Sequence, residues 1–476
     1  MSRRQRIVTF SALALLGAFV VVFLIALSLT QTEYGQGQVR RFVQSWVAGK
    51  VHGKMYVGRI SGGLFNGVTI DSVDIRDGED SLFVATGRVR VNYDIRDIFD
   101  RRILLSHLDV EHPVVHLRQH EDGSWNWRRI FPEGPKGPSN GRGFGDFIVM
   151  DSADVRNGQI ILTLPWHVSD DLKGYRRDSA ITHALGSLTR DAPGNDWPSE
   201  IRRTREGFAR TWRFTDVRSS FSYVRVSMPD TAGRFMKIAK GSLTSSDPPL
   251  QIHNLAGGVR FLGDSAWLDM PHFDLPASTG SAKGKIEWGG PLATRYAVHI
   301  VGDSVSLNDV AWVYPTLPRT GGGRLDVDMN NVRHPRIMDY AITRMDVSST
   351  RSRLVGSMTY GVGAPVLAVK DVRLEAEPLN FDLLRALNGK KFPYDWQGNI
   401  TGSVRAAGGP LDHFRVDESH FTFADAHVPG AITRGSARGE LDILYPAYTA
   451  FRGLDVNIET LDLRTLQYLN PEFLEL

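Results

Sequence analysis

Residues 88–94, with the sequence RVRVNYD, show the pattern that decides the fold of this chain. Val89, Val91 and Tyr93 are separated by arginine and asparagine, so every second residue is apolar. Successive side chains of a β-strand point to opposite faces, and this period therefore indicates a strand with one apolar and one polar face. The same alternation occurs at Leu325, Val327 and Met329, and again at Leu454, Val456 and Ile458.

Glycine, asparagine and aspartate punctuate the alternating stretches. We interpret Asp77-Gly78, Asp122-Gly123 and Asn157-Gly158 as turns between neighbouring antiparallel strands, because these residue pairs favour tight turns. Stretches with a helical period are few and short. The sequence thus predicts a mainly β fold with an antiparallel sheet.

The C-terminal part of the chain repeats itself. Short apolar helical patterns begin at Leu307, Phe381 and Leu463, and the first two are followed by glycine and a strand. The period is about 75–80 residues, and units of this kind bury their faces by stacking on their neighbours. We therefore expect an elongated, solenoid-like sheet built from repeats with short helices.

Residues 7–29 form the longest apolar stretch, and they carry no charge. About twenty such residues cross a hydrocarbon core as a helix. Arg3, Arg4 and Arg6 precede the stretch, which predicts a cytoplasmic N-terminus with the body of the chain across the membrane. The alternative is a cleaved signal peptide, whose apolar core is normally shorter.

Residues 36–50 place Val39, Phe42, Val43 and Trp46 on one helical face. This pattern predicts an amphipathic helix beside the membrane, and a simple spacer helix is the alternative. The polar stretch 165–215 interrupts the strands and is rich in arginine. We expect a helix near 199–210 there, in either a solvated excursion or a patch for anionic head groups or an acidic partner.

The predicted organisation follows from these features. It comprises a basic flank and transmembrane anchor (1–30), a juxtamembrane helical segment (31–56), a first β-module (57–131), a Pro/Gly linker (132–145), a β-segment containing the polar insertion (146–270), and repeating β-units (271–476).

Composition narrows the function classes. The chain has no cysteine, which removes thiol chemistry and cysteine-based metal sites. Its formal net charge is +3, with no long basic tract outside the membrane flank and the insertion, so we expect no nucleic-acid partner. Metalloprotease and P-loop motifs are absent from the sequence, and Gly-Asp-Ser triplets at 263–265 and 302–304 lack the flanking pattern of esterases.

Four histidines lie close together in the sequence, at His107, His112, His116 and His120. Residues four apart on a strand are separated by about 13 Å, which is too far for one metal ion. We interpret these histidines as surface or edge residues. The sequence therefore predicts no catalytic residue, no metal ligand and no cofactor, and we expect the protein not to be an enzyme.

The apolar face of such a sheet needs a cover, because its exposure costs roughly 25 cal/mol per Å². A second sheet in a sandwich, the curvature of the sheet itself, or a ligand can supply that cover. On the pattern of alternation alone, the sandwich is favoured over an open trough.

Several motifs, taken in order, point to a family. Residues 58–70 read GRISGGLFNGVTI and suggest an opening hairpin, and residues 82–117 have the order strand, short helix and two strands. Residues 122–127 (DGSWNW), an Asn-Gly pair at 157–158, and 398–404 (GNITGSV) with GGPL at 408–411 follow. This series resembles the AsmA-like family of Gram-negative inner-membrane-anchored proteins, which includes TamB.

The resemblance implies a fold and a function. It implies a curled, taco-like β-groove in the periplasm that moves phospholipid toward the outer membrane, with acyl chains in the groove. The groove candidates are Val89, Val91, Tyr93, Leu325, Val327, Met329, Leu454, Val456 and Ile458. The alternative that it implies is a TamB-like translocation and assembly module, which aids the insertion of outer-membrane proteins beside an Omp85-type barrel. The sequence shows no C-terminal TamB domain, so we expect an N-terminal portion or a short member.

Overall fold

The computed structural model describes residues 52–61, 67–94, 96–97, 102–130, 147–168, 172–186, 200–227, 233–288, 294–312, 316–331, 337–363, 368–388, 397–442 and 451–468. The chain divides into two compact units, Met1–Phe273 and Asp274–Leu476. Both units are mainly β and mostly antiparallel, as the alternation predicts.

The first unit contains short strands at its beginning and long strands after residue 153. Its strands are β1 (Gly53–Val57), β2 (Ile60–Ser61), β3 (Gly67–Ile70), β4 (Val73–Asp77), β5 (Leu82–Thr86), β6 (Val89–Tyr93), β7 (Ile103–Glu111), β8 (Val114–Arg118), β9 (Ile148–Met150), β10 (Ala153–Pro165), β11 (Glu200–Arg203), β12 (Phe208–Ser227), β13 (Arg234–Ser246) and β14 (Pro249–Leu262). Its helices are α4 (Asn126–Ile130) and α5 (Tyr175–Gly186), and β15 (Ser265–Leu275) contains the boundary between the units.

Two antiparallel series of strands form the beginning of this sheet. One runs β2–β3–β6–β7 and the other runs β1–β4–β5–β8. Both meet β10 in parallel, with Val110 opposite Val155 and Val115 opposite Ile160. These parallel pairs depart from the expected antiparallel sheet, because α4 and the residues after it separate β8 from the next strand. From β10 onward, β12, β13 and β14 pair antiparallel.

A line of left-handed residues crosses this sheet. His112, Asn157, Asp216 and Asn254 all have positive φ, between 49° and 53°, and each lies where the register shifts or one strand passes into the next. Histidine, asparagine and aspartate tolerate this conformation better than most residues. Bulges bend a strand and increase its twist, so this line bends the sheet across its strands.

The three turn predictions have different outcomes. Asp77-Gly78 does connect the antiparallel strands β4 and β5, as expected. Asp122-Gly123 forms a turn that leads into α4 instead of a strand. The prediction for Asn157-Gly158 is wrong, because this pair lies inside β10 as a bulge opposite β12. The preference of asparagine for left-handed φ serves a bend there instead of a hairpin.

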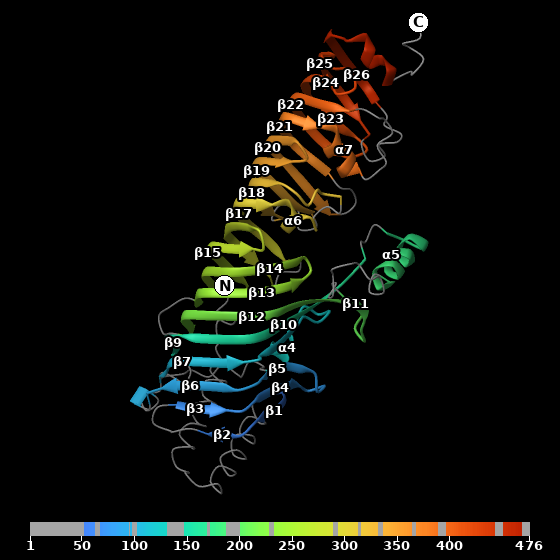
Figure 1. Ribbon diagram of the computed structural model, residues 1–476. Helices are drawn as coiled ribbons and strands as arrows, with labels where there is room; N and C mark the ends of the chain where they lie inside the picture. Colours follow the sequence, from blue (N-terminus) through green and yellow to red (C-terminus); the bar gives the residue numbers. More distant parts are fainter. Residues whose placement is uncertain are drawn as a thin grey trace. The chain divides into compact units, whose positions relative to one another are not determined.

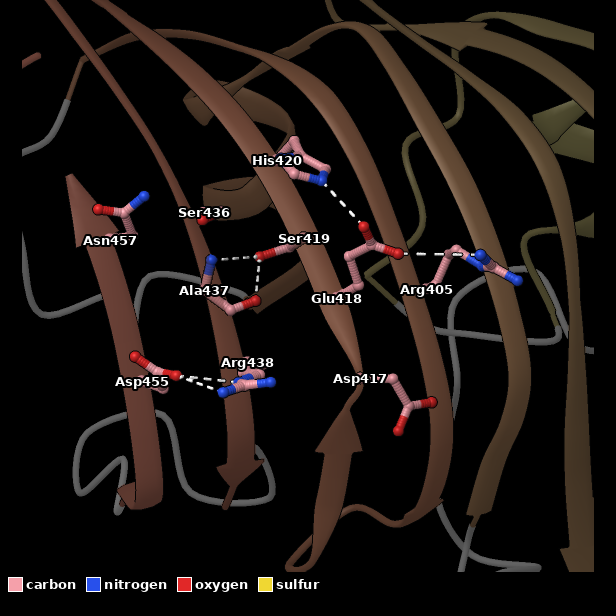
Figure 2. A pocket seen from close by; sticks show the side chains of 10 residues that line it. All are labelled: Arg405, Asp417, Glu418, Ser419, His420, Ser436, Ala437, Arg438, Asp455 and Asn457. Carbon is pink, nitrogen blue, oxygen red and sulfur yellow. Dashed lines mark hydrogen bonds and ion pairs between the residues drawn. The ribbon is translucent and has the colours of Figure 1, made fainter. Parts of the chain in front are cut away.

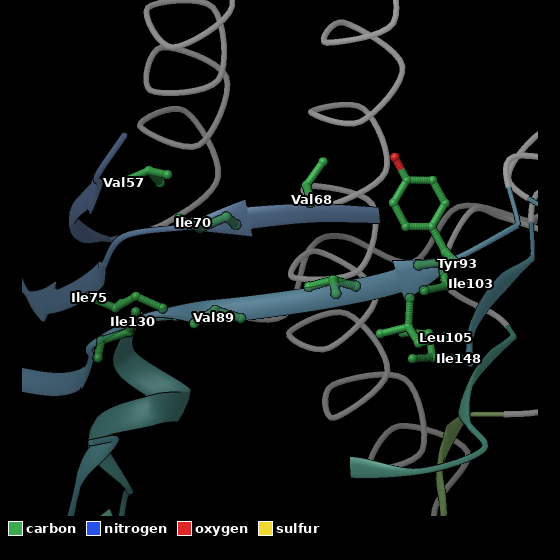
Figure 3. Packing of buried hydrophobic residues seen from close by; sticks show 11 residues of the cluster. Val57, Val68, Ile70, Ile75, Val89, Tyr93, Ile103, Leu105, Ile130 and Ile148 are labelled. Carbon is green, nitrogen blue, oxygen red and sulfur yellow. The ribbon is translucent and has the colours of Figure 1, made fainter. Parts of the chain in front are cut away.

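The hydrophobic core of the first unit is formed mainly by its first strands. It includes Val57, Val89 and Val91 from the sheet and Ile130 from α4, whose side chain is fully buried (Figure 3). A hydrogen bond holds the last turn of α4 in place: the His52 N–H donates to the Ile130 carbonyl at 2.9 Å. The end of a short helix therefore packs on the apolar face of this part of the sheet.

The second unit is an antiparallel meander. Its strands are β16 (Ser278–Glu287), β17 (Arg295–Ser306), β18 (Gly322–Asn330), β19 (Ile337–Ser349), β20 (Ser352–Gly363), β21 (Ala368–Asn380), β22 (Gly398–Pro410), β23 (Phe414–Val416), β24 (Glu418–Asp425), β25 (Ile432–Leu441) and β26 (Phe451–Thr460). Successive strands pair in chain order, with β23 and β24 together occupying one position between β22 and β25.

Short helices follow every fourth position of this meander. They are α6 (Leu307–Val310) after β17, α7 (Phe381–Asn388) after β21, and the 3-10 helix η3 (Leu463–Tyr468) after β26. Each begins at one of the three positions that the sequence marks as equivalent. Because β17 and β21 run in the same direction, α6 and α7 lie beside the same ends of the strands (Figure 1).

Several expectations fall on other parts of the chain. No helix in the described ranges combines the length and apolar character needed to cross a bilayer. The predicted span at 7–29, the predicted helix at 36–50 and the predicted linker at 132–145 lie outside the described residues. The end of the segment 31–56 is described, and from Gly53 it belongs to β1.

The predicted helix at 199–210 is wrong. Residues Glu200–Arg203 form β11, which pairs with the start of β12 in a hairpin that turns at 204–207. Ile201 is buried, while the next two residues of the strand, Arg202 and Arg203, are exposed. One buried side chain in a polar stretch gives little periodicity, so the strand is not visible in the sequence. The helix of the insertion is α5.

Candidate functional site

A row of apolar side chains crosses the sheet of the second unit. Ile300 of β17 lies opposite Val327 of β18, Val327 opposite Ile342 of β19, and Ile342 opposite Met358 of β20. Residues directly opposite each other in an antiparallel sheet point to the same face. The four side chains therefore form one continuous apolar row across four strands.

Further rows flank the first on the same face. One contains Val298, Met329, Tyr340, Tyr360 and Val369, and another contains Leu325, Met345, Gly356, Leu374 and Val404. Because side chains two residues apart on a strand share a face, the three rows form one apolar area. We call this area the apolar face.

The two faces of the sheet differ in exposure. Along β21, Asp371, Arg373 and Glu375 are exposed, whereas Val372 is buried and Leu374 is half-buried. The same alternation occurs in β22, where Ser403 is exposed and Val404 is half-buried. In β21 and β22 the apolar face is therefore shielded from water more than the polar face, whereas in β18 the aspartates are as half-buried as the apolar residues between them. Most side chains of the apolar face are not fully buried.

Ion pairs between and along strands occupy the polar face. Arg353 of β20 donates to Asp346 at 2.9 Å and to Glu377 at 2.6 Å. These bonds hold the pKa of Asp346 below its ordinary value, because Arg353 stabilises the charged carboxylate. His299 and Asp328 meet at 2.6 Å on the same side. Pairs of this kind neutralise part of the charge on the polar face.

Helix α7 covers one edge of the apolar face. The Phe381 ring meets the Phe423 ring edge-on, with centroids 5.5 Å apart. Phe423 lies opposite Ile400, two residues before Gly402 on the apolar side of β22. Phe381 and Leu383 are buried by this packing. At this edge the helix shields the apolar face from water, whereas the four side chains of the first row stay half-buried.

A hollow of about 480 Å³ opens on the polar face near β22–β26 (Figure 2). Its cations are matched by acids, since Arg405 and His420 both approach Glu418, and Arg438 donates to Asp455 at 2.7 Å. It therefore presents little unneutralised charge to a ligand. Because Arg405 alternates with Val404, this hollow and the apolar face lie on opposite sides of the sheet.

The structure places the predicted groove residues in three different settings. Val89, Val91 and Tyr93 lie in the core cluster of the first unit, where Val91 is 4% exposed. Leu325, Val327 and Met329 of β18 are half-buried on the apolar face. Leu454, Val456 and Ile458 of β26 are 43%, 46% and 43% exposed. The second and third sets lie on different strands of the second unit, and the role of all three sets as a groove stays a prediction.

Other residues of the apolar face were not predicted. They include Ile300, Ile342, Tyr340, Tyr360, Met358, Leu374 and Val404. Bulges hide them, because Ile342 and Met345 are three residues apart and yet their partners Met358 and Gly356 are two apart. A search for alternation that allows one extra residue per strand would find them.

The four histidines lie in different settings. His107 meets the Ser152 hydroxyl at 2.9 Å, His116 meets Thr163 at 3.0 Å, and His112 lies at the bend between β7 and β8. Burial lowers the pKa of His116. The prediction of a surface or edge position is wrong for His120, which is 6% exposed. Among the described residues, no three acidic or histidine side chains gather as metal ligands.

Comparison with known proteins gives no match: no family model, no curated protein and no solved structure is similar to this chain. The functional proposal therefore rests on the residues and contacts of this chain.

Proposed function

We propose that this protein is an inner-membrane-anchored, periplasmic lipid carrier of the AsmA-like kind, which moves phospholipid along the apolar face of its sheet toward the outer membrane. One observation carries the proposal. The apolar face of the second unit extends over many strands, most of its side chains are half-buried, and the described helix that packs on it covers one edge.

Acyl chains are the ligand that suits such a face. Each Å² of apolar surface removed from water contributes roughly 25 cal/mol, so a row of valine, isoleucine and methionine side chains favours a flexible hydrocarbon. The face offers few charged groups that would fix one ligand pose. Head groups then stay in water while acyl chains slide, and the transfer is passive partitioning without a covalent step, a cofactor or a catalytic residue.

The pattern of exposure supports a curled sheet. The polar side chains of β21 and β22 are exposed, while the alternate apolar side chains are shielded although few of the described helical residues cover them. Curvature of a sheet toward its apolar side produces this asymmetry. The register shifts along β17–β21 supply the bends that such curvature needs.

The sequence supports the proposed position in the cell. The apolar stretch 7–29 and its arginine flank support a single-pass anchor with the body in the periplasm. The motif series at 58–70, 122–127 and 398–404 supports membership of the AsmA-like family.

Adjacent residues on opposite faces offer a sharp test. A photo-crosslinking amino acid is placed at Val327, on the apolar face, or at Asp328, on the polar face, and the variants are expressed in Gram-negative cells with radiolabelled phosphate. We expect labelled phospholipid on the Val327 variant and little on the Asp328 variant. Equal labelling of the two positions, or none at position 327 in intact protein, contradicts the proposal.

A second candidate function is favoured by one strand. All ten residues of β26 are exposed, and among the described strands it pairs with β25. A strand with one described neighbour can add a strand from another polypeptide, which suits a TamB-like module that assists outer-membrane proteins beside an Omp85-type barrel.

Cysteine trapping distinguishes the two candidates, because the chain has no cysteine of its own. Asn457→Cys on β26 should form a disulfide with a cysteine-bearing outer-membrane client only if the edge pairs with that client. In that case, a charge at Val327 should leave client assembly unchanged. If the protein is a lipid carrier, a charge at Val327 should instead reduce lipid binding. No disulfide with the client should then form at position 457.

A further inference from the structure

The apolar face of the second unit ends differently at the two ends of its strands. Helices α6 and α7 follow the last residues of β17 and β21, and their first residues, Leu307 and Phe381, are buried. The other end contains the beginnings of β17, β19 and β21 and the last residues of β18 and β20, because neighbouring strands are antiparallel. The two ends therefore present different side chains to a ligand on this face.

Tyrosines lie at the end that is remote from α6 and α7. Tyr296 lies near the start of β17 and Tyr340 near the start of β19, and Tyr360 of β20 lies directly opposite Tyr340. Tyr296 belongs to the apolar face, because it comes two residues before Val298 in a stretch of regular register. We call Tyr296, Tyr340 and Tyr360 the tyrosine edge.

Two hydroxyls of the tyrosine edge are partly shielded from water and have no protein acceptor. Burial raises the pKa of Tyr296 and of Tyr340, and the nearby Tyr340 raises the pKa of Tyr296 further. Among the described residues, no hydrogen bond engages either hydroxyl. Neither oxygen belongs to the enclosed side-chain atoms that lack a partner, so both hydroxyls stay accessible from outside the protein.

The chemistry of tyrosine suits a boundary between hydrocarbon and water. Its ring is apolar and its hydroxyl is polar, and tyrosine is enriched where the head groups of a membrane begin. The hydroxyl is a donor, so the matching groups on a lipid are acceptor oxygens, those of the phosphate and of the acyl esters. A ligand made of hydrocarbon alone would remove water from both hydroxyls and offer no acceptor in return.

The length of the strands suits a lipid that lies along them. From Val298 to Ser306, the end of β17, the strand rises at most about 26 Å at 3.3 Å per residue. The acyl layer of one membrane leaflet is about 15 Å thick, half of the hydrocarbon core. A lipid whose head group lies at the tyrosine edge therefore has room for its acyl chains before it reaches α6.

We propose that the tyrosine edge holds the head-group end of the bound phospholipid. Tyr296 and Tyr340 donate hydrogen bonds to its phosphate or ester oxygens, and its acyl chains point toward α6 and α7. This inference rests on the proposed function, and it adds the orientation of the lipid and two residues that select for acceptor oxygens.

Fluorescence quenching tests the orientation in the full chain, purified in detergent. Because the chain has no cysteine, a bimane label is attached to Met338→Cys, two residues before Tyr340, or to Met345→Cys, further along the same strand and face. One probe is phosphatidylcholine with a nitroxide on its head group. The other is phosphatidylcholine with a nitroxide at the end of an acyl chain.

The expected result is a reversal between the two probes. The head-group nitroxide should quench the label at position 338 more than the label at 345, and the acyl-chain nitroxide should do the opposite. Equal quenching at the two positions, or the opposite order, overturns the inference while the lipid carrier stands. Absence of bound lipid and of quenching at both positions overturns the proposed function and the inference with it.

Removal of the hydroxyls tests the two donors. Tyr296→Phe combined with Tyr340→Phe keeps both rings, and the loss of hydrogen bonds to a charged phosphate should weaken phosphatidylcholine binding at least about tenfold. The matched control is Tyr56→Phe combined with Tyr223→Phe in the first unit, which should bind normally. Circular dichroism that matches the unmodified chain shows that both double variants are folded.

Pyrene, an apolar fluorophore without acceptor oxygens, separates hydrogen bonding from packing. It should bind equally to the unmodified chain and to both double variants. Equal phosphatidylcholine affinity of the two double variants overturns the role of the hydroxyls. A parallel loss of pyrene binding in the Tyr296 and Tyr340 double variant also overturns it, because the rings and not the donors would then decide binding.

Discussion

Ser278 and Ser352 make the same hydrogen bond in successive repeats of the second unit. Each hydroxyl accepts a backbone N–H from the residue that precedes a short helix, Ser306 at 2.9 Å and Asn380 at 2.8 Å. In both cases the donor lies 28 residues further along the chain. The serine therefore fixes the point at which each strand ends and each helix begins.

Loss of this bond should destabilise the repeat. Ser352 is buried, so Ser352→Ala leaves the Asn380 N–H without its partner, and we expect a loss of about 1–3 kcal/mol in the free energy of unfolding. Urea denaturation measures it. Ser403→Ala, at an exposed position of β22, is the control and should change stability by less than about 0.5 kcal/mol. Equal effects of the two substitutions would show that the hydrogen bond is unimportant.

The bend at Asn157 should reject β-branched residues. Its φ is 53°, in the left-handed region, so Asn157→Val should cost about 1–2 kcal/mol, whereas Asn157→Gly should retain stability. Thermal and urea unfolding of both variants checks this. Gln159→Val, two residues further along the same strand, provides the comparison and should be tolerated. Similar losses at positions 157 and 159 would count against the bend.

Stability should depend on pH through Glu206. Its pKa lies below its ordinary value of 4.5, chiefly because His120 donates a hydrogen bond to the carboxylate. A lowered pKa in the folded state gives stability that is present above the ordinary pKa and is lost as the pH falls through the lowered value. The stability difference between the unmodified chain and Glu206→Gln should therefore be largest near neutral pH and shrink below 4.5. Denaturation at a series of pH values measures it, and a constant difference would refute this linkage.

A charge on the apolar face should interfere with lipid. Val327→Glu places a carboxylate between Ile300 and Ile342, and we expect the amount of co-purified phospholipid to fall several-fold. Thr359→Glu, opposite Lys370 on the polar side of the sheet, is the control and should bind lipid normally. Thin-layer chromatography of extracted lipid gives the amounts. Unchanged lipid in a folded Val327→Glu variant would argue that the face is closed.

The sequence predicts the strands well where one face is apolar and the other is polar. Val89, Val91 and Tyr93 do alternate with exposed residues in β6, and β18 and β26 contain the other two predicted sets. Prediction fails where tertiary contacts decide. The strand β11 has one buried side chain, Ile201, and its arginines give no period.

The candidate site is predictable only in part. The alternation of Leu325, Val327 and Met329 identifies one strand of the apolar face, but it does not show which strands lie beside it. It also does not distinguish a covered face from an open one. Val89 and Val327 have the same local pattern, yet Ile130 of α4 joins the cluster around Val89, while Val327 stays half-buried.

The most direct measurement is native mass spectrometry of residues 31–476, purified without detergent from a Gram-negative host, followed by lipid extraction. The account predicts several phospholipid molecules on each chain, bound by the apolar face. A lipid-free, monodisperse protein would contradict it, because the apolar faces would then be closed by protein alone.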